Sequence, residues 1–145
     1  MKKFKFRLEK VLEMKERELQ REQKALADLL RHQQEAHKLL NEKRIMVEGH
    51  IQKMENVTSG EAGTLTTYYE YLQTLLQEMY HLQNRIIDLE KQADVQRKKL
   101  LDVQKEQKIL ENLKAQNYQK YLEENKKNEQ SFLDEIAMLG AQPES

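Results

Sequence analysis

The chain has 145 residues, of which 34% are charged and 38% hydrophobic, with four glycines and one proline, so long exposed helices suit it better than a thick globular core. Lysine plus arginine equal aspartate plus glutamate at 25 each, which leaves no net field to favour binding to nucleic acid or to an anionic membrane. The absence of cysteine excludes disulfides, thiolate metal sites and cysteine nucleophiles, and it fits a reducing cytoplasm.

The N-terminal stretch begins with lysines but lacks the apolar core of a signal peptide, because Glu9, Lys10 and Glu13 interrupt it. No stretch of the sequence approaches the roughly 20 apolar residues that a membrane-spanning helix needs. We therefore expect neither secretion nor direct membrane insertion, and any attachment to a membrane would go through another protein.

The first half of the chain has apolar residues that recur at seven-residue spacing with one gap, at Gln33, which predicts an amphipathic helix over about 4–57. The main series is Leu12, Leu19, Leu26, Leu40, Val47 and Met54. A companion series contains Leu8, Leu29, Ala36 and Val57, but also Lys15, Glu22, Lys43 and His50. This pattern indicates one apolar face that runs along the whole helix and includes a few polar residues.

Glycine, serine and threonine cluster in a single place, which predicts that the chain reverses direction at about 58–65. Gly60 and Gly63 mark this turn. Thr67 followed three residues later by Glu70 has the spacing of a capping box, although neighbouring threonines could equally serve as the N-cap of a second helix.

The second half, over about 66–138, follows alternating steps of four and three residues, which is a strong coiled-coil signal. The series is Leu65, Tyr68, Leu72, Leu75, Met79, Leu82, Ile86, Leu89, Ala93, Leu100, Val103 and Leu110, with only Gln96 and Gln107 polar. After Leu110 the phase drifts, which predicts a stutter or the loss of the partner helix. Residues 139–145 are expected to form a frayed tail.

Together these elements predict an all-α fold, a long antiparallel two-helix coiled-coil hairpin with a longer second helix, formed as one domain. Reversal at the turn places Phe4 opposite the region of Lys120. The stretch from Tyr121 to Leu139 is then left without an intramolecular partner. It carries an apolar stripe that needs a partner protein or a second copy to cover it.

Side chains that could support catalysis or bind metal are present but poorly arranged. His32 and His37 are five residues apart, whereas zinc-binding helices pair histidines four apart. Adjacent carboxylates such as Glu123 and Glu124 lie among lysines on helices that offer no cleft for acid catalysis. The glycines are isolated, so no phosphate-binding loop is expected. We predict that the chain is not an enzyme and binds no metal or cofactor.

Basic residues cluster at 2–7 and again at 97–108, where acidic neighbours favour a solvated face over a nucleic-acid site. Positive charge at the start of a helix opposes its macrodipole. An acidic partner surface would offset that cost, whereas an N-terminus that frays would avoid it. Tyrosines concentrate just after the turn, at 68–80, as anchors for another protein or as a cap that closes the hairpin.

Three passages of the sequence resemble the FliJ family, the soluble coiled-coil component of the bacterial flagellar (type III) protein-export apparatus, which serves motility and chemotaxis. They are Phe4-Lys-Phe-Arg-Leu-Glu-Lys-Val-Leu-Glu-Met-Lys-Glu, Tyr68-Tyr-Glu-Tyr-Leu-Gln-Thr-Leu and Glu129-Gln-Ser-Phe-Leu-Asp-Glu-Ile-Ala. The resemblance implies a non-enzymatic stalk that inserts in the hexameric ring of the export ATPase and links it to the cytoplasmic part of the membrane export gate. It also implies contacts with export chaperones, and a cytoplasmic location at the inner side of the cell membrane.

On this resemblance two sets of residues are candidate partner contacts. Those for the ATPase ring are Phe4, Phe6, Leu8, Phe132, Leu133, Ile136 and Leu139. Those for the export gate are Tyr68, Tyr71, Leu72 and Leu75. Two other functions remain open. One is a coiled-coil tether or homodimeric rod, in which the apolar stripe pairs with a second copy, and the other is a chaperone that escorts flagellar subunits.

Overall fold

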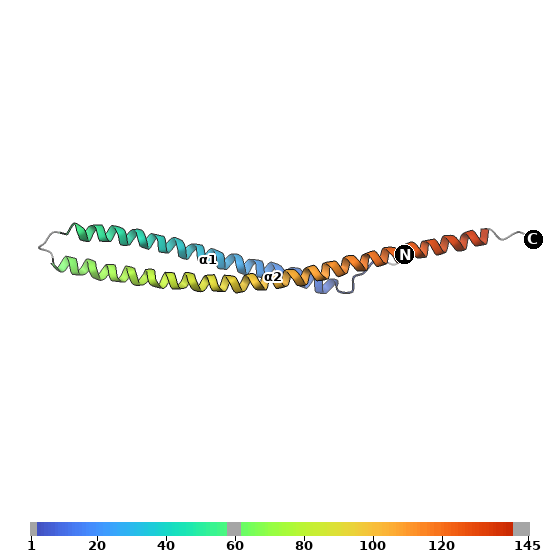
Figure 1. The fold of residues 1–145 in the computed structure, drawn as a ribbon, viewed down its shortest axis with the longest axis horizontal. Coiled ribbons are helices and arrows are strands. Elements are labelled where there is room, and N and C mark those ends of the chain that lie inside the picture. Colours follow the sequence, from blue (N-terminus) through green and yellow to red (C-terminus); the bar gives the residue numbers. More distant parts are fainter. Residues whose placement is uncertain (1–2, 58–61, 141–145) are drawn as a thin grey trace, which may run out of the picture. The chain divides into compact units, whose positions relative to one another are not determined.

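The computed structural model describes residues 3–57 and 62–140 (Figure 1). These residues form two α-helices, α1 (Glu9–Glu55) and α2 (Ala62–Gly140), and they contain no strand. The two helices pack against each other, and α2 is the longer. The predicted all-α hairpin with a longer second helix is confirmed.

The helix boundaries near the turn differ from the expected ones. The turn predicted at 58–65 falls partly outside the described residues, as does Gly60, and α2 already begins at Ala62. Gly63 therefore lies within the helix, and the hydroxyl of Thr67 donates to its carbonyl over 3.1 Å. The predicted capping box at Thr67 is wrong, because the helix starts before this residue and Thr67 bonds back to the preceding turn.

The N-terminal helix begins later than the sequence pattern suggested. Residues 3–6 have no regular structure, and α1 starts at Glu9 instead of Phe4. A hydrogen bond of 3.1 Å from the backbone N–H of Glu9 to the carbonyl of Phe6 joins the first residue of α1 to the segment that precedes the helix. The macrodipole explains this start, because Glu9 is favourable in a first turn while Lys5 and Arg7 would be unfavourable there.

Contacts divide the chain into two units. The terminal unit consists of Met1–Gln20 and Leu101–Ser145, and the turn unit consists of Arg21–Leu100. Each unit contains a segment of α1 and a segment of α2. The prediction of a single domain over 1–145 stays a prediction.

In the turn unit the two helices meet along the predicted apolar series, and we call this line of contact between the helices the seam. Its buried cluster is Ala36, Leu40, Ile86 and Leu89, with Leu29, Met79 and Leu82 packed against it. The cross-helix contacts run in opposite order along the two helices, since Gln33 bonds to Glu90 and the later Lys43 bonds to the earlier Glu78. The helix segments of this unit are therefore antiparallel, as predicted.

Polar residues of the companion series have partners across the seam of the turn unit. The Gln96 amide donates to the backbone carbonyl of Glu22 over 3.1 Å and also to its carboxylate. Nε2 of His50 donates to the carbonyl of Tyr68 over 2.5 Å, and both His50 and Gln96 are buried. Because a shifted register would leave these polar groups unpaired, the bonds favour one alignment of the helices.

The terminal unit has the same kind of seam. Leu12 and Val103 are buried. The Lys15 ammonium lies 2.5 Å from the Glu106 carboxylate, and Lys114 lies 2.8 Å from Glu9. The earlier residue of α1 again pairs with the later residue of α2. The segments of this unit are thus antiparallel as well.

Two of these ion pairs make the stability of the chain depend on alkaline pH. The hydrogen bond to Glu106 raises the pKa of Lys15 above its ordinary value of 10.5, and the bond to Glu78 does the same for the pKa of Lys43. Because each lysine has a higher pKa in the folded than in the unfolded chain, its ion pair stabilises the fold fully at a pH below the ordinary lysine pKa. This stabilisation is lost as the pH rises through the raised pKa of the folded state.

We therefore expect a variant with Lys15→Met and Lys43→Met to lose less stability than the unaltered chain between about pH 9 and about pH 12. Urea unfolding followed by circular dichroism at both pH values measures the difference. An identical alkaline loss in the two proteins would show that these ion pairs do not contribute.

Candidate functional site

Among the described residues of the terminal unit, the last part of α2 has no partner helix. The Phe4 ring lies 5.2 Å from the ring of Tyr118 and 5.5 Å from that of Tyr121, close to the pairing expected with the region of Lys120. Past this point no other described segment of the terminal unit runs beside α2, which continues to Gly140 (Figure 1). Every residue of the helix from 126 onward is exposed. We call residues 122–140 the overhang.

The distal part of the overhang, from residue 132 onward, carries a dense set of exposed apolar side chains. They are Phe132, Leu133, Ile136, Met138 and Leu139, with exposed fractions between 49% and 73%. Such a cluster on a single solvated helix is unusual for a surface that stays uncovered. Four of these five residues belong to the predicted ATPase contacts, and the structure leaves all four accessible.

The other predicted ATPase contacts lie in the segment that precedes α1. We call residues 3–8 the N-terminal strap. Phe6 is only 7% exposed, Phe4 and Leu8 are half-buried, and the Phe4 ring packs on two tyrosines of α2. These apolar side chains therefore hold the strap against α2, and only the smaller, uncovered parts of Phe4 and Leu8 remain accessible to a partner protein.

The predicted gate contacts are split by the seam of the turn unit. Leu75 is 1% exposed, and Tyr68 and Leu72 are half-buried, so these residues belong to the packing between the helices. Tyr71 is exposed, and its ring makes an edge contact with His50 at 4.9 Å. Only Tyr71 of the four offers much surface to a partner.

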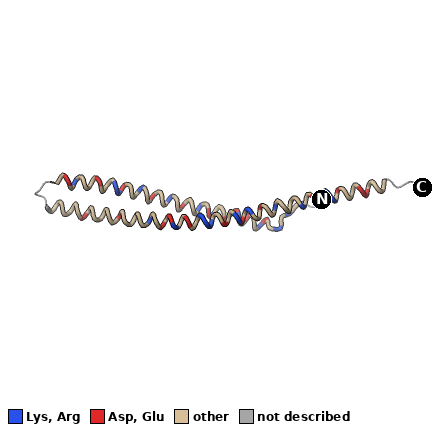
Figure 2. Tube along the Cα trace, in the orientation of Figure 1, with Lys and Arg blue, Asp and Glu red and all other residues tan. Residues whose placement is uncertain are grey.

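A neighbouring face of α2 carries exposed apolar residues that the sequence reasoning missed as a set. They are Tyr69, Leu76, Tyr80 and Ile87, which we call the turn-side stripe. Steps of seven, four and seven residues place them on one helical face, one position beyond the seam. The surrounding stretch 62–84 has only Glu70 and Glu78 as charged residues, and this part of α2 is mostly tan in Figure 2. Low charge beside an apolar repeat is the signal that could have found the stripe.

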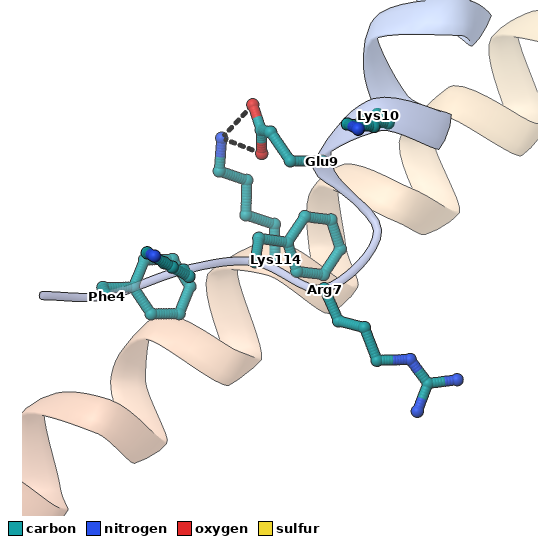
Figure 3. Close-up of a pocket in the computed structure, with 7 residues that line it drawn as sticks. Phe4, Arg7, Glu9, Lys10 and Lys114 are labelled. Atoms are coloured by element: carbon teal, nitrogen blue, oxygen red, sulfur yellow. Dashed lines mark hydrogen bonds and ion pairs between the residues drawn. The ribbon is translucent and has the colours of Figure 1, made fainter.

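A surface hollow of about 650 Å³ lies beside the strap (Figure 3). Its lining residues are Phe4, Lys5, Phe6, Arg7, Glu9, Lys10 and Lys114. The Lys114 ammonium contacts both carboxylate oxygens of Glu9, at 2.8 and 3.1 Å. Glu9 is therefore already paired, and the rest of the polar lining is cationic.

The comparisons with known proteins decide the family. The family model described as "Flagellar FliJ protein" matches residues 4–144. The chain belongs to the FliJ family. No match was found among curated proteins or among solved structures. Membership of the FliJ family makes the chain a component of the flagellar protein-export apparatus and confirms the resemblance seen in the three passages.

Within residues 3–57 and 62–140, no group of three or more histidine, aspartate or glutamate side chains could hold a metal ion. Neither helix, as far as it is described, is apolar enough over a sufficient length to cross a membrane. The surfaces that distinguish the chain are thus the overhang, the turn-side stripe and the hollow beside the strap.

Proposed function

We propose that this FliJ-family chain is a non-enzymatic stalk that inserts in the export ATPase ring and links it to the cytoplasmic part of the export gate. In this role it promotes ATPase assembly and activity, and with them the export of flagellar subunits. The observation that carries the proposal is the overhang, a single helix with an uncovered apolar stripe. A narrow helix of this kind fits a central channel better than a flat docking face.

The proposed contacts with the ring are those of the overhang, chiefly Phe132, Leu133, Ile136 and Leu139. Aromatic and large aliphatic residues dominate the energy of protein interfaces when a partner removes them from water. A helix in contact with several ring subunits passes a conformational preference between them only if its contacts differ among the states of the ring. One helix cannot present the same side chains to every subunit of a ring, which supports this mode of action.

For the export gate we propose the turn-side stripe together with Tyr71. Tyr69, Leu76 and Tyr80 are exposed, whereas Leu75 is enclosed between the helices and supports the face from behind. Tyrosine is enriched among residues that anchor protein interfaces. The proposed gate contact therefore still lies in the tyrosine-rich stretch that follows the turn, but on the exposed face of α2 and not at the residues packed between the helices. Attachment through the gate would hold the chain at the cytoplasmic side of the membrane.

The proposal is tested by adding the purified chain to the cognate export ATPase. We expect ring assembly in sizing experiments and a rise in the rate of ATP hydrolysis that saturates with added chain. A stalk that lowers the free energy of the assembled ring produces both effects together. No change at saturating chain would leave the tether or the chaperone as the function.

A homodimeric rod is the second candidate, because a second copy would also cover the apolar side chains of the overhang. Solution mass distinguishes the two functions. A monomer at micromolar concentration favours the stalk, whereas a tight dimer that Ile136→Asp dissociates favours the rod. Stable complexes with flagellar subunits in the absence of the ATPase would instead indicate a chaperone.

A further inference from the structure

The N-terminal strap presents cations on the side that does not face α2. Lys3, Lys5 and Arg7 are exposed, and they alternate with the buried Phe6 and the half-buried Phe4. Residues 3–6 are irregular, and Arg7 lies in the turn that leads into α1, where the backbone N–H of Glu9 bonds to the carbonyl of Phe6. The strap therefore carries a short row of positive charges, with its phenylalanines turned toward the protein.

These cations are not neutralised by the chain itself. Within the described residues, Lys5, Arg7 and Lys10 form no ion pair, and the one acidic residue of the hollow, Glu9, is bound to Lys114. Lys10 lies in the first turn of α1, where the macrodipole adds to the positive potential. The rim of the hollow thus has unpaired charges of a single sign.

The strap is held in place before any partner arrives. Phe6 is buried, the Phe4 ring packs on α2, and the backbone N–H of Glu9 bonds to the Phe6 carbonyl. The ion pair between Glu9 and Lys114 closes the same region, as Figure 3 shows. An N-terminus that frays would have avoided the clash of its lysines with the helix macrodipole, but this one is anchored. Anchoring reduces the entropy that a partner must remove on binding.

We propose that the strap and the hollow beside it bind an acidic segment of a protein partner. Carboxylates of that segment meet Lys5, Arg7 and Lys10, and its neighbouring apolar groups cover the exposed edge of the Phe4 ring. The assignment of this segment to a subunit of the ATPase ring rests on the proposed function, because the overhang belongs to the same unit. An anionic membrane is a poorer match, since basic segments that bind membranes insert their aromatic side chains and here these are packed against α2.

The first test measures binding of a fluorescent oligoglutamate peptide to the full chain at low salt. We expect the combined change Lys5→Gln, Arg7→Gln and Lys10→Gln to weaken binding about tenfold, as the loss of three exposed charge pairs would. The matched control is Lys98→Gln, Lys99→Gln and Lys108→Gln, three exposed lysines of α2 that remove the same charge. The control should change binding less than about twofold, and raising the salt to about 300 mM should abolish the difference.

Equal weakening by both triple variants would overturn the proposal, because only the net charge would then matter. So would binding to vesicles of anionic lipid in the absence of peptide binding.

The second test repeats the ATPase assay with the same variants. If the strap variant alone loses the peptide and no form of the chain stimulates the ATPase, the acidic-segment proposal stands and the stalk function fails. If the unaltered chain stimulates the ATPase but binds no peptide, the stalk stands and the strap proposal fails.

Discussion

Leu75→Ala is expected to lower the free energy of unfolding by about 2–4 kcal/mol, the usual range for removing a fully enclosed leucine side chain. Leu75 is 1% exposed, so the substitution leaves a cavity between α1 and α2 that the surrounding side chains cannot fill by small shifts. Urea unfolding followed by circular dichroism measures the loss.

The adjacent residue supplies the control. Leu76 is 44% exposed, so Leu76→Ala should change the stability by no more than about 0.5 kcal/mol. The same substitution should weaken binding to the cytoplasmic part of the export gate, because Leu76 lies in the turn-side stripe. Similar losses of stability from the two substitutions would mean that the seam does not run through Leu75. Unchanged gate binding by Leu76→Ala would remove that residue from the proposed contact.

The seam itself was largely predictable from the sequence. Leu12, Leu40 and Ile86 were expected at the interface from their spacing alone, and all three are buried. This part of the fold is local in origin, because a helix with one apolar stripe can remove it from water only by packing it against another stripe. The greater length of α2 was predictable as well, because the sequence after the turn is longer than the sequence before it.

Partners of the polar seam residues could not be predicted in the same way. The sequence showed that Glu22 and His50 interrupt the apolar series, but their partners depend on the register between two helices far apart in sequence. In the structure Gln96 bonds to Glu22, and the carbonyl of Tyr68 accepts from His50. A backbone carbonyl carries no sequence signal at all, so the second of these contacts was out of reach of sequence reasoning.

The start of α1 shows where the heptad pattern misled the prediction. Leu8 fits the companion series, which extended the predicted helix back to Phe4, but the pattern takes no account of the charges around it. Lys5 and Arg7 disfavour a helix start, and Phe4 packs on α2 from a segment without regular structure. The segment predicted to make apolar contacts with the ATPase ring therefore exposes cations, and the apolar contacts that we propose are those of the overhang alone.

Truncation after Tyr121 is expected to weaken association with the export ATPase strongly while leaving the paired part of both helices folded. The removed residues include the whole apolar set of the overhang, and the helix from 126 onward is exposed throughout. They contribute helical signal but no packing between helices. The midpoint of thermal unfolding should therefore stay within a few degrees, about the shift that 1 kcal/mol would produce. Pull-down of the ATPase and its rate of ATP hydrolysis measure the functional loss.

A point substitution separates the apolar contact from mere helix length. Ile136→Asp in the full chain should weaken ATPase binding at least about tenfold, because a charge would then be placed in the centre of the buried contact. Met14→Asp is the matched control, since Met14 is an exposed apolar residue of α1 in the same unit. Full ATPase stimulation by the truncated chain would remove the overhang from the mechanism. The strap and the body of the terminal unit would then be the only parts of that unit left to contact the ring.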